Sequence, residues 1–160
     1  MKLTPHSARI YIFLAALFLA LPAINKTIYP SKSGHLLVAP IGSPAPFDEA
    51  AIYIMHHDLF SAHGVIINKP NKDAPLVGGA LSYYGGPVST TTHLDYYDMT
   101  GQNRPYLGYA GWGPVQLDYE LLREGWHLVD ATADILSAPP ESMWKKALEK
   151  VPLKKSKVML

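Results

Sequence analysis

Three histidines lie close together in the first half of the chain, at His56, His57 and His63. Imidazole groups bind metal ions and exchange protons near neutral pH, so this cluster is the first place to look for chemistry. Its spacing does not favour a shared metal, because adjacent residues of a strand point to opposite faces of a sheet. We therefore predict no catalytic residue, no metal and no cofactor, and we expect His56 and His57 to line a ligand groove.

Two further segments have the composition of a functional site, but they lack the spacing of a phosphate-binding or catalytic motif. Gly85-Gly86-Pro87 lacks the glycine and lysine spacing of phosphate-binding loops, so it predicts a turn. Residues 89–95 hold hydroxyl, imidazole and carboxylate groups, but groups so near in sequence seldom converge as a catalytic triad, so a polar strand edge is expected. Tyr109 follows Gly108 in an uncrowded stretch that leaves its hydroxyl free, and we add it to the groove candidates.

The elements that position these residues begin with a predicted β-hairpin. Residues 50–55 and 64–67 are short runs rich in Ile, Val and Tyr. The residues between these runs are polar or small, as the connection of a hairpin requires. Pro70 cannot donate to a sheet ladder, so it should end the second strand.

Further strands are predicted at residues 36–39, 108–112 and 126–129, with a short edge segment at 76–79 and a turn into another strand at 83–88. Strands outnumber helices and do not alternate regularly with them. This pattern predicts an α+β fold rather than a doubly wound parallel sheet.

Two helices are predicted. Pro114 suits the start of a helix over residues 115–124, which Gly125 ends. Pro139-Pro140 opens a second, amphipathic helix. Its apolar residues share one face: Met143, Trp144, Ala147, Leu148 and Val151.

The predicted hairpin resembles the signature of the YqgE/AlgH family, also called UPF0301 or DUF179. The matching hairpin residues are Phe47, Tyr53, His57, Gly64, Ile67, Asn68, Lys69 and Pro70. The resemblance extends over roughly residues 36–151, through Gly85, Gly86, Pro87, Gly108, Tyr109, Trp112, Trp126 and Trp144. One departure is large: only residues 89–107 separate the Gly-Gly-Pro and Gly-Tyr-Ala motifs, so the middle of the chain is shortened.

The resemblance implies a mixed, partly barrel-like sheet with helices on its outside. It marks Asn68 and Lys69 as fold-determining residues around a groove, together with Tyr109. The three tryptophans are expected in the core, because each supplies a large buried area. The resemblance also implies a link to the regulation of gene expression.

The N-terminal segment predicts a membrane anchor or signal peptide. Residues 10–24 are almost wholly apolar, with Lys2 and Arg9 before them and no acidic residue before Asp48. The run is short for a bilayer span of about 20 residues, so both interpretations stay open. Leu21 stands where a signal cleavage site prefers a small residue, which favours an uncleaved anchor. The predicted parts are an anchor or signal segment (1–25), a linker (26–34), the domain (35–153) and a basic tail (154–160).

Composition limits the function further. A chain of 160 residues with a net charge of +1 is one domain's length, and it contains no cysteine, which excludes thiolate chemistry. Lysines concentrate near the C-terminus between Lys145 and Lys157 and could contact lipid head groups. No helix-turn-helix or zinc-finger pattern is present, so nucleic acid is not an expected partner.

These observations predict a non-enzymatic, membrane-tethered protein. We expect it to bind protein partners as a regulatory or accessory subunit of a membrane-associated complex, anchored in the bacterial inner membrane by one span. Positive charges favour a cytoplasmic N-terminus and hence a periplasmic domain, whereas the resemblance implies a soluble cytoplasmic protein. Two alternatives remain: export after signal cleavage, and a small-ligand binder or histidine-dependent enzyme with a groove near Gly85-Gly86-Pro87.

Overall fold

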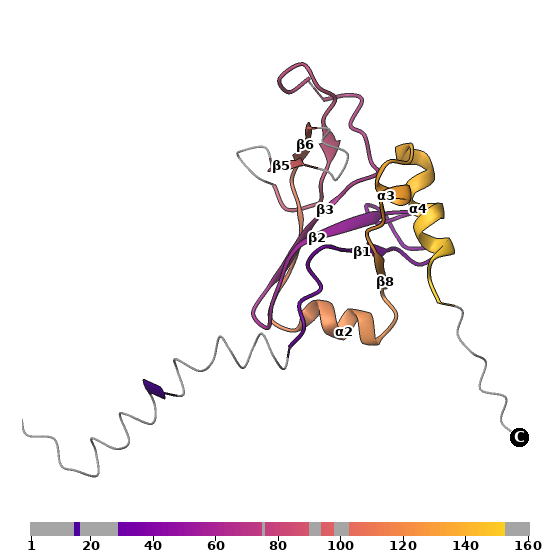
Figure 1. Ribbon diagram of the computed structural model, residues 1–160. Helices are drawn as coiled ribbons and strands as arrows, with labels where there is room; N and C mark the ends of the chain where they lie inside the picture. Colours follow the sequence, from indigo (N-terminus) through magenta and orange to yellow (C-terminus); the bar gives the residue numbers. More distant parts are fainter. Residues whose placement is uncertain (1–14, 17–28, 75, 90–93, 98–102, 153–160) are drawn as a thin grey trace, which may run out of the picture. The chain divides into compact units, whose positions relative to one another are not determined.

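The computed structural model describes residues 15–16, 29–74, 76–89, 94–97 and 103–152 (Figure 1). The chain divides into two units, residues 1–31 and residues 32–160, and the elements below all belong to the second. The predicted membrane segment 10–24 lies outside the described residues except for Ala15 and Ala16, and so does the predicted tail 154–160. Within the described ranges, no helix has the length and apolar character needed to cross a membrane.

A five-stranded antiparallel sheet forms the centre of the domain. Its strands lie in the order β7-β3-β2-β1-β8. Their bounds are β1 His35–Val38, β2 Ala51–His57, β3 Ala62–Ile66, β7 Ala110–Trp112 and β8 His127–Asp130.

The predicted hairpin is confirmed as β2 and β3, which pair antiparallel with Ile52 opposite Ile66. Ala62 and His63 belong to β3 rather than to the connection, so the turn is tighter than expected. Asp58 closes this turn, because its Oδ1 accepts the backbone N–H of Phe60 at 2.8 Å and of Ser61 at 2.9 Å.

A second, three-stranded sheet has the order β4-β6-β5. It contains β4 Tyr83–Tyr84, β5 Leu94–Tyr97 and β6 Asn103–Leu107. β4 and β6 run parallel, and β5 and β6 antiparallel, so the mixed pairing expected of the fold is found in this sheet. The expected partial barrel is wrong: the five-stranded sheet is open, with β7 and β8 as its edges. The edge segment expected at 76–79 is an isolated bridge between Val77 and Ala80.

Three helices are described: α2 Gln116–Leu122, α3 Ala133–Leu136 and α4 Pro140–Glu149. α2 and α4 confirm the two predicted helices, and the short α3 was not predicted. The face expected for α4 packs on the sheet, with Met143 and Ala147 fully buried. Trp144 fixes this helix by donating its Nε1–H to the carbonyl oxygen of Ala39 at 2.8 Å.

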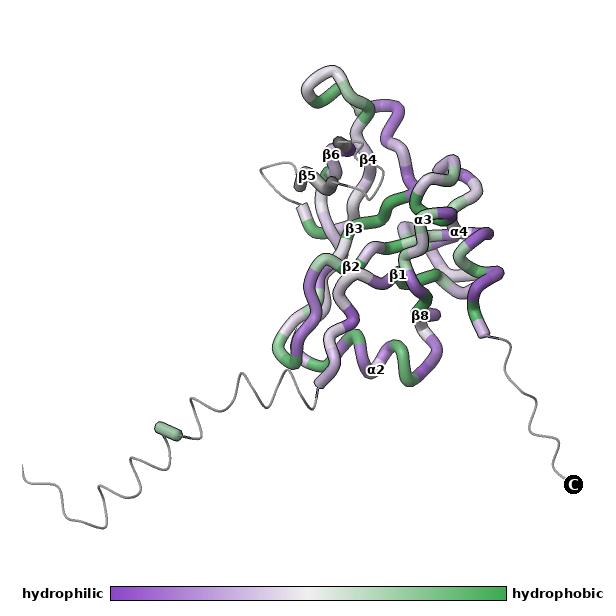
Figure 2. Tube along the Cα trace, in the orientation of Figure 1, coloured by the Kyte–Doolittle hydropathy of each residue, from purple (hydrophilic) through white to green (hydrophobic). Residues whose placement is uncertain are grey.

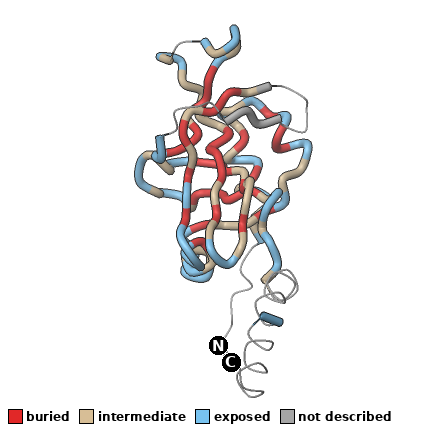
Figure 3. Tube along the Cα trace, turned by 90° about the vertical axis from the view of Figure 1, so that its left-hand side faces the viewer, coloured by how far each residue is buried: buried red, intermediate tan, exposed pale blue. Residues whose placement is uncertain are grey.

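The core has two parts, because successive residues of a strand point to opposite faces of the sheet. In β1, Leu36 and Val38 pack in the part that contains α3 and α4 residues. Leu37 packs in the other part, with Trp112, Trp126 and Leu117 of α2. Buried residues therefore run along the central strands, and exposed residues surround them (Figure 3).

The predicted Gly85-Gly86-Pro87 turn is where the two sheets join. The carbonyl of Gly85 accepts the N–H of Ile66 at 2.8 Å, and its own N–H donates to Leu107 of β6 at 2.8 Å. A Cβ at Gly85 would lie 2.2 Å from the carbonyl oxygen of Gly108, which itself has φ of +77°. Glycine is required here because two backbones cross without room for a side chain.

The substitution Gly85→Ala should destabilise the whole domain, because backbone atoms cannot yield to the added methyl group as a flexible side chain can. We expect a loss of at least about 2 kcal/mol in the free energy of unfolding. Urea denaturation of the full chain in mild detergent measures it. Gly113→Ala is the matched control, since a Cβ at Gly113 meets its nearest atom at 3.8 Å. Equal stability of the two variants would contradict the crossing as a constraint.

Candidate functional site

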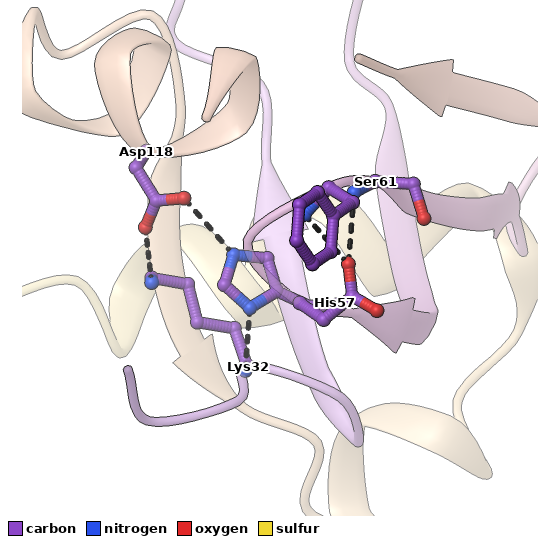
Figure 4. A network of polar contacts seen from close by, with 6 residues as sticks. Lys32, His57, Ser61 and Asp118 are labelled. Atoms are coloured by element: carbon purple, nitrogen blue, oxygen red, sulfur yellow. Dashed lines mark hydrogen bonds and ion pairs between the residues drawn. The ribbon is translucent and has the colours of Figure 1, made fainter. Parts of the chain in front are cut away.

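His57 lies at the end of β2 with a side chain that is only 1% exposed. Its Nδ1 accepts the backbone N–H of Lys32 at 3.2 Å, and its Nε2 lies 3.2 Å from Oδ2 of Asp118 on α2. The other carboxylate oxygen of Asp118 pairs with Nζ of Lys32. Figure 4 shows that Asp118 reaches His57 and Lys32 from the helix, so three separate parts of the chain meet at one imidazole.

The geometry assigns the protonation state of His57. Because Nδ1 accepts a hydrogen bond, the ring proton is on Nε2, which donates to Asp118. Burial first, and then the positive charge of Lys32, lower the pKa of His57 to about 4. Burial also raises the pKa of Asp118 and lowers that of Lys32. At neutral pH His57 is uncharged and both of its ring nitrogens are hydrogen-bonded. It was predicted to line a ligand groove, but it does not line either of the two grooves described below.

The same network fastens the start of the domain. Lys32 is bonded to β2 and α2, and the N–H of Gly34 donates to the carbonyl of Ile54 at 2.8 Å. These residues were expected to belong to the linker 26–34. The part from Lys32 to Gly34 is instead held against the sheet.

His56 belongs to a different cluster. It pairs with His63 across β2 and β3, and the two rings stack with centroids 5.3 Å apart. Tyr109 contacts His63 edge-on at 6.2 Å. His56 also lies 3.1 Å from Asp58, with its Nε2 facing Oδ2. His56 and His57 were expected to point to opposite faces of the sheet. In agreement with this, the two side chains contact different sets of residues.

A cavity of about 350 Å³ lies beside this cluster. His63, Tyr109 and Val88 line it together with residues of β7. Val88 follows the Gly-Gly-Pro turn and pairs with Tyr109, so this cavity lies beside that turn. Burial lowers the pKa of His63, and the neighbouring His56 ring acts in the same direction. His63 is therefore mainly neutral at pH 7, able to donate and to accept one hydrogen bond.

Asn68 and Lys69 do not line this cavity. Asn68 accepts the N–H of Ala51 at 2.9 Å and donates to the carbonyl of Glu49 at 2.8 Å, which fixes the chain before β2. Lys69 pairs with Asp48 at 2.7 Å and lowers the pKa of that carboxyl. Both residues contact the segment that leads into β2.

Glu120 is a half-buried residue of the α2 network that the sequence did not place among the site candidates. Its Oε2 accepts the indole N–H groups of Trp112 at 2.8 Å and Trp126 at 2.9 Å. Its Oε1 accepts the side-chain amide of Gln116 at 2.9 Å, one turn earlier in α2. Gln116 and Glu120 are four residues apart and share one side of the predicted helix, but this spacing does not identify the distant tryptophan partners of Glu120.

A larger, mostly apolar groove of about 720 Å³ lies between α2, α4 and β8. Ile41, at the edge of this groove, is 81% exposed. Its wall includes Leu121, Trp126, Leu128 and Leu148, with Lys32 and His127 among its few polar residues. In the part of the chain that the structure describes, no three histidine, aspartate or glutamate side chains gather as metal ligands would.

His57 makes the stability of the domain depend on pH. Between its ordinary pKa of 6.5 and its folded value of about 4, the unfolded chain binds a proton that the folded chain does not. Stability is complete above pH 6.5 and decreases as the pH falls through this window, by about 3 kcal/mol in total. Urea denaturation of the wild type and of His57→Gln from pH 7.5 to 4 should show a steeper loss for the wild type. Parallel profiles would contradict the buried neutral state.

Comparison with known proteins relates this fold to a family. The AlgH-like family model matches residues 89–156. A UPF0301 protein of Methylococcus capsulatus is 31% identical, over 76% of this chain and 92% of that protein. A UPF0301 protein of Streptomyces avermitilis is 28% identical, over 75% of this chain and 86% of that protein. Both alignments extend over 167 positions, more than the 160 residues of this chain, so they contain gaps on its side.

Solved structures show the same architecture. The solution structure of the AlgH protein from Pseudomonas aeruginosa is similar with a TM-score of 0.57 and 25% identity, over 76% of this chain and 89% of that one. A crystal structure of a Corynebacterium diphtheriae protein is similar with a TM-score of 0.62, over 78% of this chain and 89% of that one. Its 18% identity makes it evidence for the fold alone.

Proposed function

Since the chain belongs to the AlgH-like family of UPF0301 proteins, we propose that it is a membrane-tethered member that acts by binding a protein partner rather than by catalysis. Residues 10–24 would hold it at the membrane, and the domain would serve as a regulatory or accessory subunit of a membrane-associated assembly. The flanking charges favour the bacterial inner membrane with the domain in the periplasm; export after cleavage of residues 1–23 is the alternative.

One observation carries this proposal: His57, the most buried histidine among the residues that the structure describes, holds the start of the domain in place. Both nitrogens of His57 are occupied, by Lys32 and by Asp118. Lys32 is separated from the apolar run by a short linker, so a tether attached there would be joined to a partly buried ion pair rather than to a loose end of the chain. Such a network suits a domain held at a fixed point of its surface.

The large apolar groove offers a surface for a partner. It begins at Lys32 and is lined mainly by aliphatic residues, and Ile41 stands exposed at its edge. Exposed apolar surface of this kind, with a few polar groups around it, is typical of protein-binding sites. A partner in the same membrane would meet the domain on the side where the tether joins it.

Affinity purification of the tagged full chain from its native membrane in mild detergent tests this proposal. We expect the uncleaved chain, identified by intact mass, in a stoichiometric complex with a membrane protein. Ile41→Glu should lower the recovered partner by at least about tenfold, because a carboxylate in an apolar contact is desolvated without a counter-charge.

Leu76→Glu is the matched control, because Leu76 is also largely exposed, at 63%, and lies outside the groove. It should leave the complex intact. A processed, solitary chain would overturn both the tether and the partner. An anchored chain whose partner is indifferent to Ile41→Glu would remove only the groove from the proposal.

Small-ligand binding is a second candidate, favoured by the cavity beside His63 and Tyr109. A thermal-shift screen of small organic ligands against the full chain in mild detergent tests it. A ligand of this cavity should raise the melting temperature of the wild type and of His127→Gln, and should lose its effect on His63→Gln. Equal shifts in all three proteins would place the ligand elsewhere.

A further inference from the structure

The outward side of α2 is apolar although it is not buried. Tyr119 and Leu122 are 55% and 81% exposed, and their spacing of three residues places them on one side of the helix; Val115, which directly precedes the helix, is 49% exposed. Leu117, on the inward side, is 1% exposed. A short surface helix normally carries polar residues on its solvent side, so this arrangement is unusual.

The turn between β2 and β3 extends this surface. Phe60 is 65% exposed and Leu59 37% exposed, and the carbonyl of Leu59 accepts the N–H of Val115 at 3.2 Å. The turn and the helix are therefore adjacent, and Figure 2 shows hydrophobic residues on both. We call these five residues, Leu59, Phe60, Val115, Tyr119 and Leu122, the α2 patch.

The backbone at Val115 indicates that this valine is not there for the stability of the domain. Val115 has φ of +53°, a left-handed conformation that is strained for a β-branched residue. Its side chain gains little burial in return, since the residue is half exposed. Glycine or asparagine would fit this backbone at lower energy. We therefore infer that the valine side chain contacts something outside the domain.

The acidic groups around the α2 patch are engaged within the domain. Asp118 is held by Lys32 and His57, and Glu120 accepts both indole N–H groups described above. Asp58 accepts the N–H groups of its own turn. On the patch itself, the guanidinium of Arg123 lies over the Tyr119 ring at 5.4 Å. An aromatic ring with an arginine beside it is suited to the boundary between lipid tails and head groups.

The tether brings a lipid surface within reach of the α2 patch. The apolar run ends at Ile24, and Lys32, eight residues later, is bonded to Asp118 on the helix that carries the patch. Eight extended residues span at most about 26–29 Å. If the run is embedded in a membrane as proposed, this linker keeps Lys32 within that distance of the membrane.

We propose that the α2 patch docks on the lipid surface of the membrane to which the chain is tethered. This inference rests on the proposed membrane anchor. Phe60 and Leu122 enter the boundary of the acyl chains, Tyr119 lies at head-group depth, and Arg123 contacts lipid phosphates. The apolar groove then stays available for a protein partner.

The absence of cysteine from the chain permits a direct test, because a single introduced cysteine is a unique labelling site. An environment-sensitive fluorophore is attached to the full chain at Leu14→Cys, Leu122→Cys or Leu76→Cys. Each protein is reconstituted into vesicles of phosphatidylcholine and phosphatidylglycerol, with and without brominated acyl chains. Leu14 reports the anchor, Leu122 reports the α2 patch, and Leu76 is the exposed control in the segment before β4, at the other end of the domain from α2 (Figure 1).

We expect brominated lipid to quench the labels at positions 14 and 122 by at least about half, and to leave the label at 76 unchanged. Phe60→Cys is a second patch position and should behave like Leu122→Cys. Quenching at 14 without quenching at 122 and 60 would overturn the docking and keep the anchor. No quenching at 14 would overturn the anchor and, with it, the docking.

If the α2 patch binds a second copy of the chain or another protein instead of lipid, the labels report a different result. A second copy of the chain would shield the label at 122 from water without lipid quenching, and Leu122→Cys would cross-link to itself under oxidation. A protein partner would leave the label at 122 solvent-exposed in vesicles that contain the chain alone. Either result contradicts docking on lipid.

Discussion

The burial of His57 determines how the start of the domain and α2 are arranged on the sheet. An imidazole with almost no exposure must have both nitrogens hydrogen-bonded, because a buried polar group without a partner is strongly destabilising. One nitrogen takes the backbone N–H of Lys32 and the other takes Asp118. The first contact fixes where the chain begins to follow the sheet. The second fixes the rotation of α2 about its axis.

A second constraint, the crossing at Gly85 and Gly108, determines the opposite end. It joins β3 of the large sheet to β6 of the small sheet through backbone hydrogen bonds. The same crossing places Val88 against Tyr109 and so forms one side of the cavity beside His63. The cavity and the α2 end depend on different interactions, and a change in one of them is not expected to alter the other.

Local patterns predicted much of the fold from the sequence. The hairpin and the helix that begins at Pro140 were found because strand alternation, turn residues and helix spacing are all local signals. The strand β6 was missed because Pro105 lies inside it, and proline ordinarily argues against a strand. The closure of the sheet was predicted wrongly, since whether two edges meet depends on the pairing of distant strands, which no local pattern contains.

The sites were harder to predict for the same reason. The sequence separated His56 from His57 correctly, because alternation within a strand is local. It did not identify the partners of His57, which are 25 and 61 residues away. Tyr109 was named as a groove candidate, but His63, whose ring contacts both Tyr109 and His56, was not. Asn68 and Lys69 were placed at a groove because their motif is distinctive, whereas their contacts are with the start of β2.

Because α2 is short, its contacts with the rest of the domain determine which of its residues face solvent. A helix of seven residues is not stable alone, so tertiary contacts must hold it. Leu117 and Leu121 pack inward, Asp118 is bound to His57 and Lys32, and Glu120 is bound to two tryptophans. Any rotation of the helix that buried Tyr119 or Leu122 would expose these groups and break the ion pair with Lys32. The exposed apolar face and the position of Lys32 at the start of the domain are therefore two results of a single set of contacts, and the domain cannot change one while it keeps the other.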